Sequence, residues 1–164
     1  MERTLIKDLR EKIDQQVTLK GWLQTLRDQK SMQFLILRDR TGLAQVAHWK
    51  KGNLDLAELI STLGTESALT ITGKVVANEV VKLGGIEIQL ESLKVENNAE
   101  LPLPFEPFND TLPDQDYRLD WRYLDLRRER NRLIFETQTT LEQAMREYWL
   151  ANGFIEVHSP KIMG

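Results

Sequence analysis

Apolar and polar residues alternate with a period of two through most of residues 16–95, and this pattern constrains the fold more than any other feature of the sequence. Successive side chains of a β-strand point to opposite faces, so alternation predicts strands with one buried face. The segments that show it are residues 16–26, 33–39, 43–49, 68–77 and 85–95. A helical pattern interrupts them at residues 53–64, where Asn53 is the expected N-cap and Gly64 the stop signal.

The order strand, strand, strand, helix, strand, strand is that of the OB-fold, a five-stranded Greek-key barrel with a helix between its third and fourth strands. Gly21 lies within the first strand, where glycine eases the sharp bend that a small barrel needs. Gly42 is expected to take a positive φ in the turn after the second strand, and Gly84-Gly85 predicts a hairpin. An SH3-like barrel is the main alternative, but it lacks a full helix at that point. We therefore predict a mainly β, OB-type barrel, preceded by a short amphipathic helix within residues 1–13.

The pattern changes beyond the barrel. Residues 97–113 contain four prolines and no periodicity, which is typical of an extended, semi-rigid linker. A helix is expected over residues 131–152, followed by a short strand at 154–157. The apolar stripe of this helix has nothing local to pack against and consists of Ile134, Leu141, Met145, Tyr148 and Trp149. The sequence thus predicts a barrel domain over 1–97, a linker and hinge over 98–130, and the start of a truncated α+β domain over 131–164.

Composition excludes several classes of site. The chain has no cysteine and two separate histidines, His48 and His158, so disulfides, thiolate metal sites and a histidine zinc site are not expected. No apolar run is long enough to span a bilayer and the first residues are charged rather than signal-like, so we expect a cytoplasmic protein without a membrane partner. The net charge is −3, yet residues 20–40 and 118–132 are each basic. Such patches suit a polyanion held at particular places, although solvated charge on an ordinary surface gives the same pattern.

One side of the second predicted strand is a candidate surface for nucleic acid. Leu35 and Leu37 point to one side of this strand, and Met32, Phe34 and Ile36 point to the other. A small barrel has one interior, so one of these stripes faces outward. Outward aromatic residues on the second and third strands of an OB barrel are where single-stranded nucleic acid stacks. Phe34 is therefore the predicted stacking residue, and the alternative is that Phe34 belongs to the core or lies under the N-terminal helix.

Polar residues near Phe34 complete the candidate site. Arg27, Lys30 and Arg38 are at hand to contact phosphates. Gln45 and Glu87 lie on the third and fifth predicted strands. A glutamine amide both donates and accepts hydrogen bonds while a carboxylate only accepts, so this pair can distinguish base edges, which a purely cationic groove cannot do.

Three segments also carry a family resemblance that covers almost the whole chain. GWLQTLRDQKSMQFLILRDRTGLAQV, at residues 21–46, resembles the anticodon-binding barrel of class IIb aminoacyl-tRNA synthetases. RLDWRYLDLRR, at 118–128, resembles the hinge of aspartyl-tRNA synthetases, and GFIEVHSPKI, at 153–162, resembles motif one of class II synthetases. LRDRTG favours the aspartyl family over the asparaginyl and lysyl ones. HSPKI and the short hairpin at Gly84-Gly85 favour its archaeal-eukaryotic type.

The resemblance implies a role for each residue of the candidate site. In that family an aromatic residue on the second strand stacks on the central anticodon base, a uracil, and the matching residue here is Phe34. Gln45 and Glu87 match the residues that recognise this uracil, and Arg27 matches the arginine of the first strand. Lys30 lies in the loop from Asp28 to Met32, which matches the one recognising the flanking bases. The implied partner is the anticodon stem-loop of tRNA(Asp), and the sequence leaves open whether tRNA(Asn) is a substrate as well.

The resemblance also implies an enzyme, a ligase that attaches aspartate to tRNA with ATP and Mg²⁺. Motif one forms the dimer interface of class II synthetases, so Pro160 is expected to have a structural role in a homodimer. The ATP-binding and aminoacylating residues of the family lie in later motifs. We therefore expect an N-terminal fragment with no catalytic residue, no metal site, no cofactor of its own and no activity alone. The alternatives are a stand-alone OB module that binds single-stranded nucleic acid, or an asparaginyl or lysyl synthetase.

Overall fold

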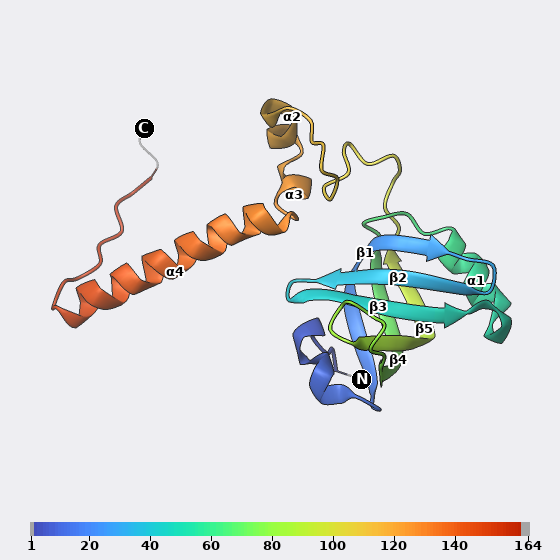
Figure 1. Cartoon of the computed structure of the whole chain (residues 1–164). Helices are drawn as coiled ribbons and strands as arrows, with labels where there is room; N and C mark the ends of the chain where they lie inside the picture. Colours follow the sequence, from blue (N-terminus) through green and yellow to red (C-terminus); the bar gives the residue numbers. More distant parts are fainter. Residues whose placement is uncertain (1, 162–164) are drawn as a thin grey trace. The chain divides into compact units, whose positions relative to one another are not determined.

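The computed structural model describes residues 2–161. The chain divides into two compact units, with the boundary between Leu101 and Pro102. The first unit is a closed five-stranded barrel with the strand order β1-β2-β3-β5-β4 (Figure 1). Its elements are η1 (Ile6–Lys12), β1 (Gln16–Asp28), β2 (Met32–Asp39), β3 (Gly42–Trp49), η2 (Lys50–Gly52), α1 (Leu54–Ser61), β4 (Ala68–Ala77) and β5 (Ile86–Asn97). The predicted OB-fold is confirmed, including the helix between the third and fourth strands.

Apolar residues from all five strands and from both flanking helices share one core. The fully buried apolar residues of β2 are Leu35 and Leu37, as their alternation predicts. The predicted N-terminal helix forms as a 3₁₀ helix rather than an α-helix, and it buries Ile6 and Leu9. The core cluster consists of Ile6, Leu9, Val17, Leu19, Leu23, Leu35, Leu37, Ala44, Val46, Leu56, Ile60, Leu63, Leu69, Ile71, Val75, Ile86 and Ile88.

Strand β1 is shared between two neighbours, and Gly21 lies where it changes partner. Its first half pairs with β4 from Gln16 to Trp22, and its second half pairs with β2 from Trp22 to Asp28. A Cβ atom on Gly21 would lie 2.3 Å from the backbone oxygen of Arg38, far inside van der Waals contact. Glycine is therefore required at this point because the backbones of β1 and β2 approach so closely.

One turn of the barrel depends on glycines with positive φ angles, and another depends on a side chain. Gly84 and Gly85 have φ angles of +85° and +71°, as expected for the hairpin that joins β4 to β5. The prediction for Gly42 is wrong, because this residue does not take a positive φ. Asp39 orders the β2–β3 turn instead: its Oδ1 accepts from the backbone N of Thr41 at 2.6 Å and of Gly42 at 3.2 Å. A carboxylate bonded to backbone N–H groups makes a left-handed residue unnecessary there.

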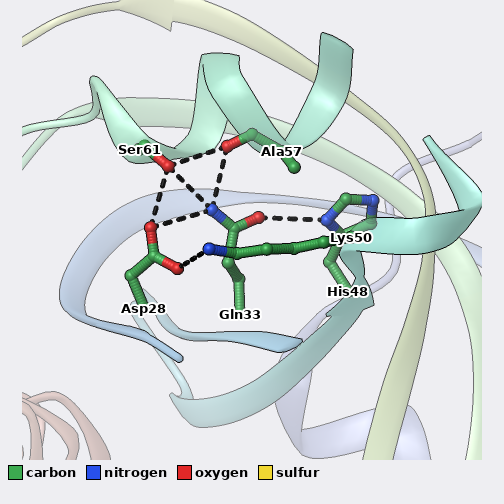
Figure 2. A network of polar contacts seen from close by, with 6 residues as sticks. All are labelled: Asp28, Gln33, His48, Lys50, Ala57 and Ser61. Carbon is green, nitrogen blue, oxygen red and sulfur yellow. Dashed lines mark hydrogen bonds and ion pairs between the residues drawn. The ribbon is translucent and has the colours of Figure 1, made fainter. Parts of the chain in front are cut away.

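A buried polar network lies between α1 and the barrel, and Gln33 is its centre (Figure 2). The Gln33 side-chain nitrogen lies 2.9 Å from the carbonyl oxygen of Ala57 and 3.0 Å from Ser61 Oγ. Its side-chain oxygen lies 3.1 Å from Nδ1 of His48. Since the Gln33 nitrogen faces acceptors, its oxygen must accept, and Nδ1 of His48 carries the hydrogen that it donates. Asp28 and Lys50 complete the network through an ion pair at its edge.

The second unit contains α2 (Gln115–Asp120), α3 (Arg122–Asp125) and α4 (Glu129–Ala151). The predicted long helix is confirmed as α4, and its apolar stripe is exposed. The strand predicted at 154–157 does not form; residues 154–160 have neither helix nor strand. A strand needs a neighbour for its backbone hydrogen bonds, and the described part of this unit has no other strand. None of the helices within residues 2–161 is long and apolar enough to cross a membrane.

Substituting Gly21 should test the close approach of β1 and β2. The added methyl group of Gly21→Ala would collide with the Arg38 backbone, so we expect a loss of about 1–3 kcal/mol in the free energy of unfolding. Gly52→Ala is the matched control, since a Cβ atom there would meet nothing within 4 Å. Urea denaturation of both variants measures the difference. Equal stability of Gly21→Ala and Gly52→Ala would contradict the proposed constraint.

The buried network should make stability depend on pH. Burial, assisted by the charge of Lys50, lowers the pKa of His48 below its usual 6.5. The unfolded chain therefore binds a proton that the folded chain does not, so stability is complete above about pH 6.5 and decreases as the pH falls below that value. The pKa of Asp28 is lowered by Lys50 and Ser61, so this carboxylate stays ionised in the same range.

Urea denaturation at about pH 7.5 and pH 5.5 checks this direction. We expect the unfolding free energy of the native chain to be smaller at the lower pH. His48→Gln should remove most of that pH dependence, while His158→Gln, in the exposed C-terminal segment, should retain it. A His48→Gln chain that loses stability between the two pH values as much as the native chain would show that other groups are responsible.

Candidate nucleic-acid interface

A groove of about 500 Å³ runs over the outer surface of the barrel. Strands β1, β2, β3 and β5 and the hairpin between β4 and β5 contribute its walls. Its lining residues are Arg27, Gln29, Phe34, Gln45, Asn78, Val80, Val81, Lys82, Leu83 and Glu87. Four of the predicted binding residues, Arg27, Phe34, Gln45 and Glu87, thus lie in one groove, although they come from four different strands.

Strand register explains why these four residues meet. Arg27 is the β1 partner of Phe34 on β2. Val46 of β3 pairs with Ile88 of β5 in the parallel pairing that closes the barrel. Both of these residues point into the core, so the residues before them, Gln45 and Glu87, point together to the outside.

Phe34 is half-buried at the surface and is not part of the core cluster. Its two neighbours on β2, Gln33 and Leu35, are fully buried, so the alternation that predicts an outward Phe34 is confirmed. The alternative of a core phenylalanine is excluded. Part of its ring lies against the groove, where a flat, apolar group can be covered by another flat, apolar group.

Gln45 and Glu87 form a fixed pair. The Gln45 side-chain nitrogen donates to Oε2 of Glu87 at 2.8 Å, and Asn78 donates to the same oxygen at 3.4 Å. Glu87 is only 5% exposed, so this carboxylate is held in place by its partners. The hydrogen bond orients the Gln45 amide and leaves its oxygen, and Oε1 of Glu87, without a hydrogen bond from the described residues. The pair therefore presents acceptors and one remaining amide hydrogen to a ligand in the groove.

Cations lie in and beside the groove. Arg27 and Lys82 line it and are exposed, and Lys30 is exposed in the loop between β1 and β2 without lining the groove. Arg38 has a different place from the one expected. Its guanidinium binds both oxygens of Glu66 at 2.8 Å, and its side chain is largely buried. Arg38 therefore serves the fold rather than the groove.

Several groove and network residues were missed from the sequence. Gln29 belongs to the loop of residues 28–32 that the resemblance implied, but its place in the groove was not predicted. Asn78 and Lys82 lie between β4 and β5, where Gly84-Gly85 predicted a hairpin without indicating that the hairpin would form a wall of the groove. Gln33 is polar yet lies on the buried face of β2, so its position in the alternation indicates burial without indicating its partners. The hydrogen bonds of Gln33 reach α1 and β3, which no local pattern reveals.

Pro160 and His158 lie exposed in the segment after α4, which has no regular secondary structure. The residues from 2 to 161 contain no group of three or more His, Cys, Asp or Glu side chains that could hold a metal ion.

Family models match both parts of the chain. Residues 17–96 match the OB-fold nucleic acid binding domain, and residues 114–164 match the class II tRNA synthetases of the D, K and N group. The aspartate–tRNA(Asp) ligase of Thermoplasma volcanium is 40% identical over 164 residues, which cover 99% of this chain and 38% of the relative. The aspartate–tRNA(Asp/Asn) ligase of Archaeoglobus fulgidus is 40% identical over 150 residues, 91% of this chain and 35% of the relative.

Two solved structures of tRNA synthetases are similar to this chain. The aspartyl-tRNA synthetase of Entamoeba histolytica superposes with a TM-score of 0.89 at 27% identity, over 99% of this chain and 40% of its own. The asparaginyl-tRNA synthetase of Pyrococcus horikoshii superposes with a TM-score of 0.87 at 30% identity, over 98% of this chain and 37% of its own. The chain thus spans little more than a third of the length of these relatives. With the barrel and the segment after residue 114 both matched, the chain belongs to the class II tRNA synthetases of the aspartyl, lysyl and asparaginyl group.

Proposed function

We propose that the barrel binds the anticodon of a tRNA as part of an aspartate–tRNA ligase, which attaches aspartate to tRNA(Asp) with ATP. One observation carries the proposal: Phe34, Arg27 and the Gln45–Glu87 pair line a single groove on an OB barrel. The relatives with 40% identity are named aspartate ligases, which favours aspartate over asparagine or lysine as the amino acid. Their names differ in the tRNA, either tRNA(Asp) alone or tRNA(Asp) and tRNA(Asn).

The groove suits a single unstacked uracil. The Phe34 ring provides a face on which a base stacks, and such a stack is worth about 1–3 kcal/mol. A uracil edge has one N–H donor between two carbonyl acceptors. The free acceptor oxygens of Glu87 and Gln45 match the donor, and the remaining amide hydrogen of Gln45 matches a carbonyl. The same ring nitrogen of cytosine carries no hydrogen and is an acceptor. It would therefore face the acceptor oxygens of Glu87 and Gln45 without forming a hydrogen bond to them.

Phosphates are the proposed partners of the exposed cations. Arg27 and Lys82 at the groove and Lys30 in the neighbouring loop would each neutralise backbone charge without distinguishing bases. The chain carries a net charge of −3, so these local cations, rather than the overall charge, would attract RNA.

The remaining parts of the proposed enzyme follow from family membership. Residues 1–97 would be the anticodon-binding domain, 98–130 the linker and hinge, and 131–164 the start of the catalytic domain. Pro160 would belong to the interface of a homodimer. ATP and Mg²⁺ would serve the full-length enzyme, and no step of their chemistry is assigned to the residues of this chain. A cytoplasmic location stays a prediction.

Removing the Phe34 ring should weaken RNA binding without unfolding the barrel. The expected effect of Phe34→Ala is a loss of affinity for the tRNA(Asp) anticodon stem-loop of roughly tenfold or more, because one base stack is lost. Its melting temperature should change little, since Phe34 lies outside the core cluster. Trp22→Ala is the control, because Trp22 is an exposed aromatic residue that does not line the groove. Fluorescence anisotropy measures affinity; an equal loss in both variants would contradict the stacking role.

Gln45→Ala should reduce discrimination at the central anticodon base. Hydrogen bonds to base edges carry sequence information, whereas phosphate contacts do not. Lys30→Ala should instead weaken all RNAs alike and reduce the dependence of affinity on salt. Titrations with stem-loops that carry U, C or A at the centre separate the two effects. If Gln45→Ala lowers the affinity for all three stem-loops by the same factor, Gln45 does not recognise the base.

A further inference from the structure

The loop between β1 and β2 consists of three exposed residues, Gln29, Lys30 and Ser31. Two backbone hydrogen bonds fix its ends. The Gln29 nitrogen donates to the Met32 oxygen at 2.9 Å, and the Lys50 nitrogen donates to the Ser31 oxygen at 3.1 Å. The second bond attaches the loop to η2, which follows β3 directly.

Asp28, the last residue of β1, fixes the start of the same loop. Its carboxylate forms an ion pair with Nζ of Lys50 and accepts from Ser61 Oγ at 2.8 Å and from the Gln33 side-chain nitrogen at 3.2 Å (Figure 2). Lys50 therefore holds the loop twice, with its backbone at Ser31 and with its side chain at Asp28. The loop is attached to α1 and η2 rather than standing free.

Gln33 connects these anchors to the core. Its side-chain nitrogen has three acceptors within 3.2 Å but only two hydrogens, and its oxygen is occupied by His48. Leu35 and Leu37 lie on the same face of β2, so an apolar side chain of similar size would fit the fold at position 33. Replacing Gln33 alone would still cost some stability, because the His48 N–H and the Ala57 carbonyl oxygen lose their bonds to the amide. Beyond stability, the amide adds orientation, because it fixes Asp28 and with it the loop.

The loop borders the groove. Gln29, which follows Asp28 directly, lines the groove together with Phe34 and Arg27. Single-stranded RNA with one base in the groove would bring a neighbouring base to this loop. Gln29 offers an amide and Ser31 a hydroxyl, both exposed and able to form hydrogen bonds with a base edge, while the Lys30 ammonium group between them is free to contact a phosphate.

We infer that Gln33 is a positioning residue for recognition of the anticodon bases that flank the central one. It acts through Asp28 and the loop of residues 29–31 and does not touch RNA itself. The inference rests on the proposed function, and what it adds is the role of Gln33, which does not belong to the Gln45–Glu87 pair.

Gln33→Met in the full chain tests this inference, because methionine keeps the size of the side chain and removes its hydrogen bonds. The probes are anticodon stem-loops in which each flanking base is replaced in turn while the central uracil is kept. We expect the preference for the native flanking base to fall roughly three- to tenfold. The preference for uracil at the centre should not change. Hydrogen exchange of the Gln29 and Lys50 amides should become faster, since both close the loop.

Glu66→Gln is the matched control. Glu66 is a buried polar residue whose partner, Arg38, lies at the other end of β2, so this variant also loses a buried interaction but leaves the loop network intact. Both base preferences should survive in Glu66→Gln. An unchanged flanking preference in Gln33→Met, or a uniform loss of affinity in both variants, would overturn the inference alone, as would a native chain that binds without any flanking preference. A native chain that binds none of the stem-loops would overturn the proposed function and the inference with it.

Discussion

The parallel pairing of β3 with β5 closes the barrel, and the rest of the molecule depends on it. Val46 beside Ile88 places two fully buried side chains in the core. The same register sets Gln45 beside Glu87 on the outer face, where they form a hydrogen bond of 2.8 Å. One backbone constraint thus creates both the core and the polar wall of the groove. A shift of one residue would exchange the two faces and remove both.

Much of this could be predicted from the sequence because alternation is a local property. Leu35 and Leu37 inside and Phe34 outside follow from the period of two, and Asn53 caps α1 as expected, accepting from the Leu56 nitrogen. The failures concern positions whose state is decided elsewhere in the chain. In the β2–β3 turn the hydrogen bonds of Asp39 order the backbone, so Gly42 does not need a positive φ. The strand expected at 154–157 does not form because it lacks the neighbour that strand pairing requires.

The hydrogen-bond partners of Gln33 cannot be predicted from the local sequence pattern. Its position on the inner face of β2 predicts burial, and burial of an amide demands partners. Those partners lie on α1, on β3 and at the end of β1, so only the folded barrel identifies them. The groove residues divide in the same way. Phe34 follows from alternation, whereas the contribution of Lys82 depends on the path of the hairpin between β4 and β5.

A photocrosslink tests the central claim most directly. An anticodon stem-loop with 5-iodouridine at the central position would be irradiated with the native chain, and the attached peptide identified by mass spectrometry. Stacking in the groove predicts that the crosslink falls on Phe34, since this is the aromatic ring that lines it. A crosslink to Trp22, on the barrel surface outside the groove, or to the aromatic residues of α4 would contradict the account.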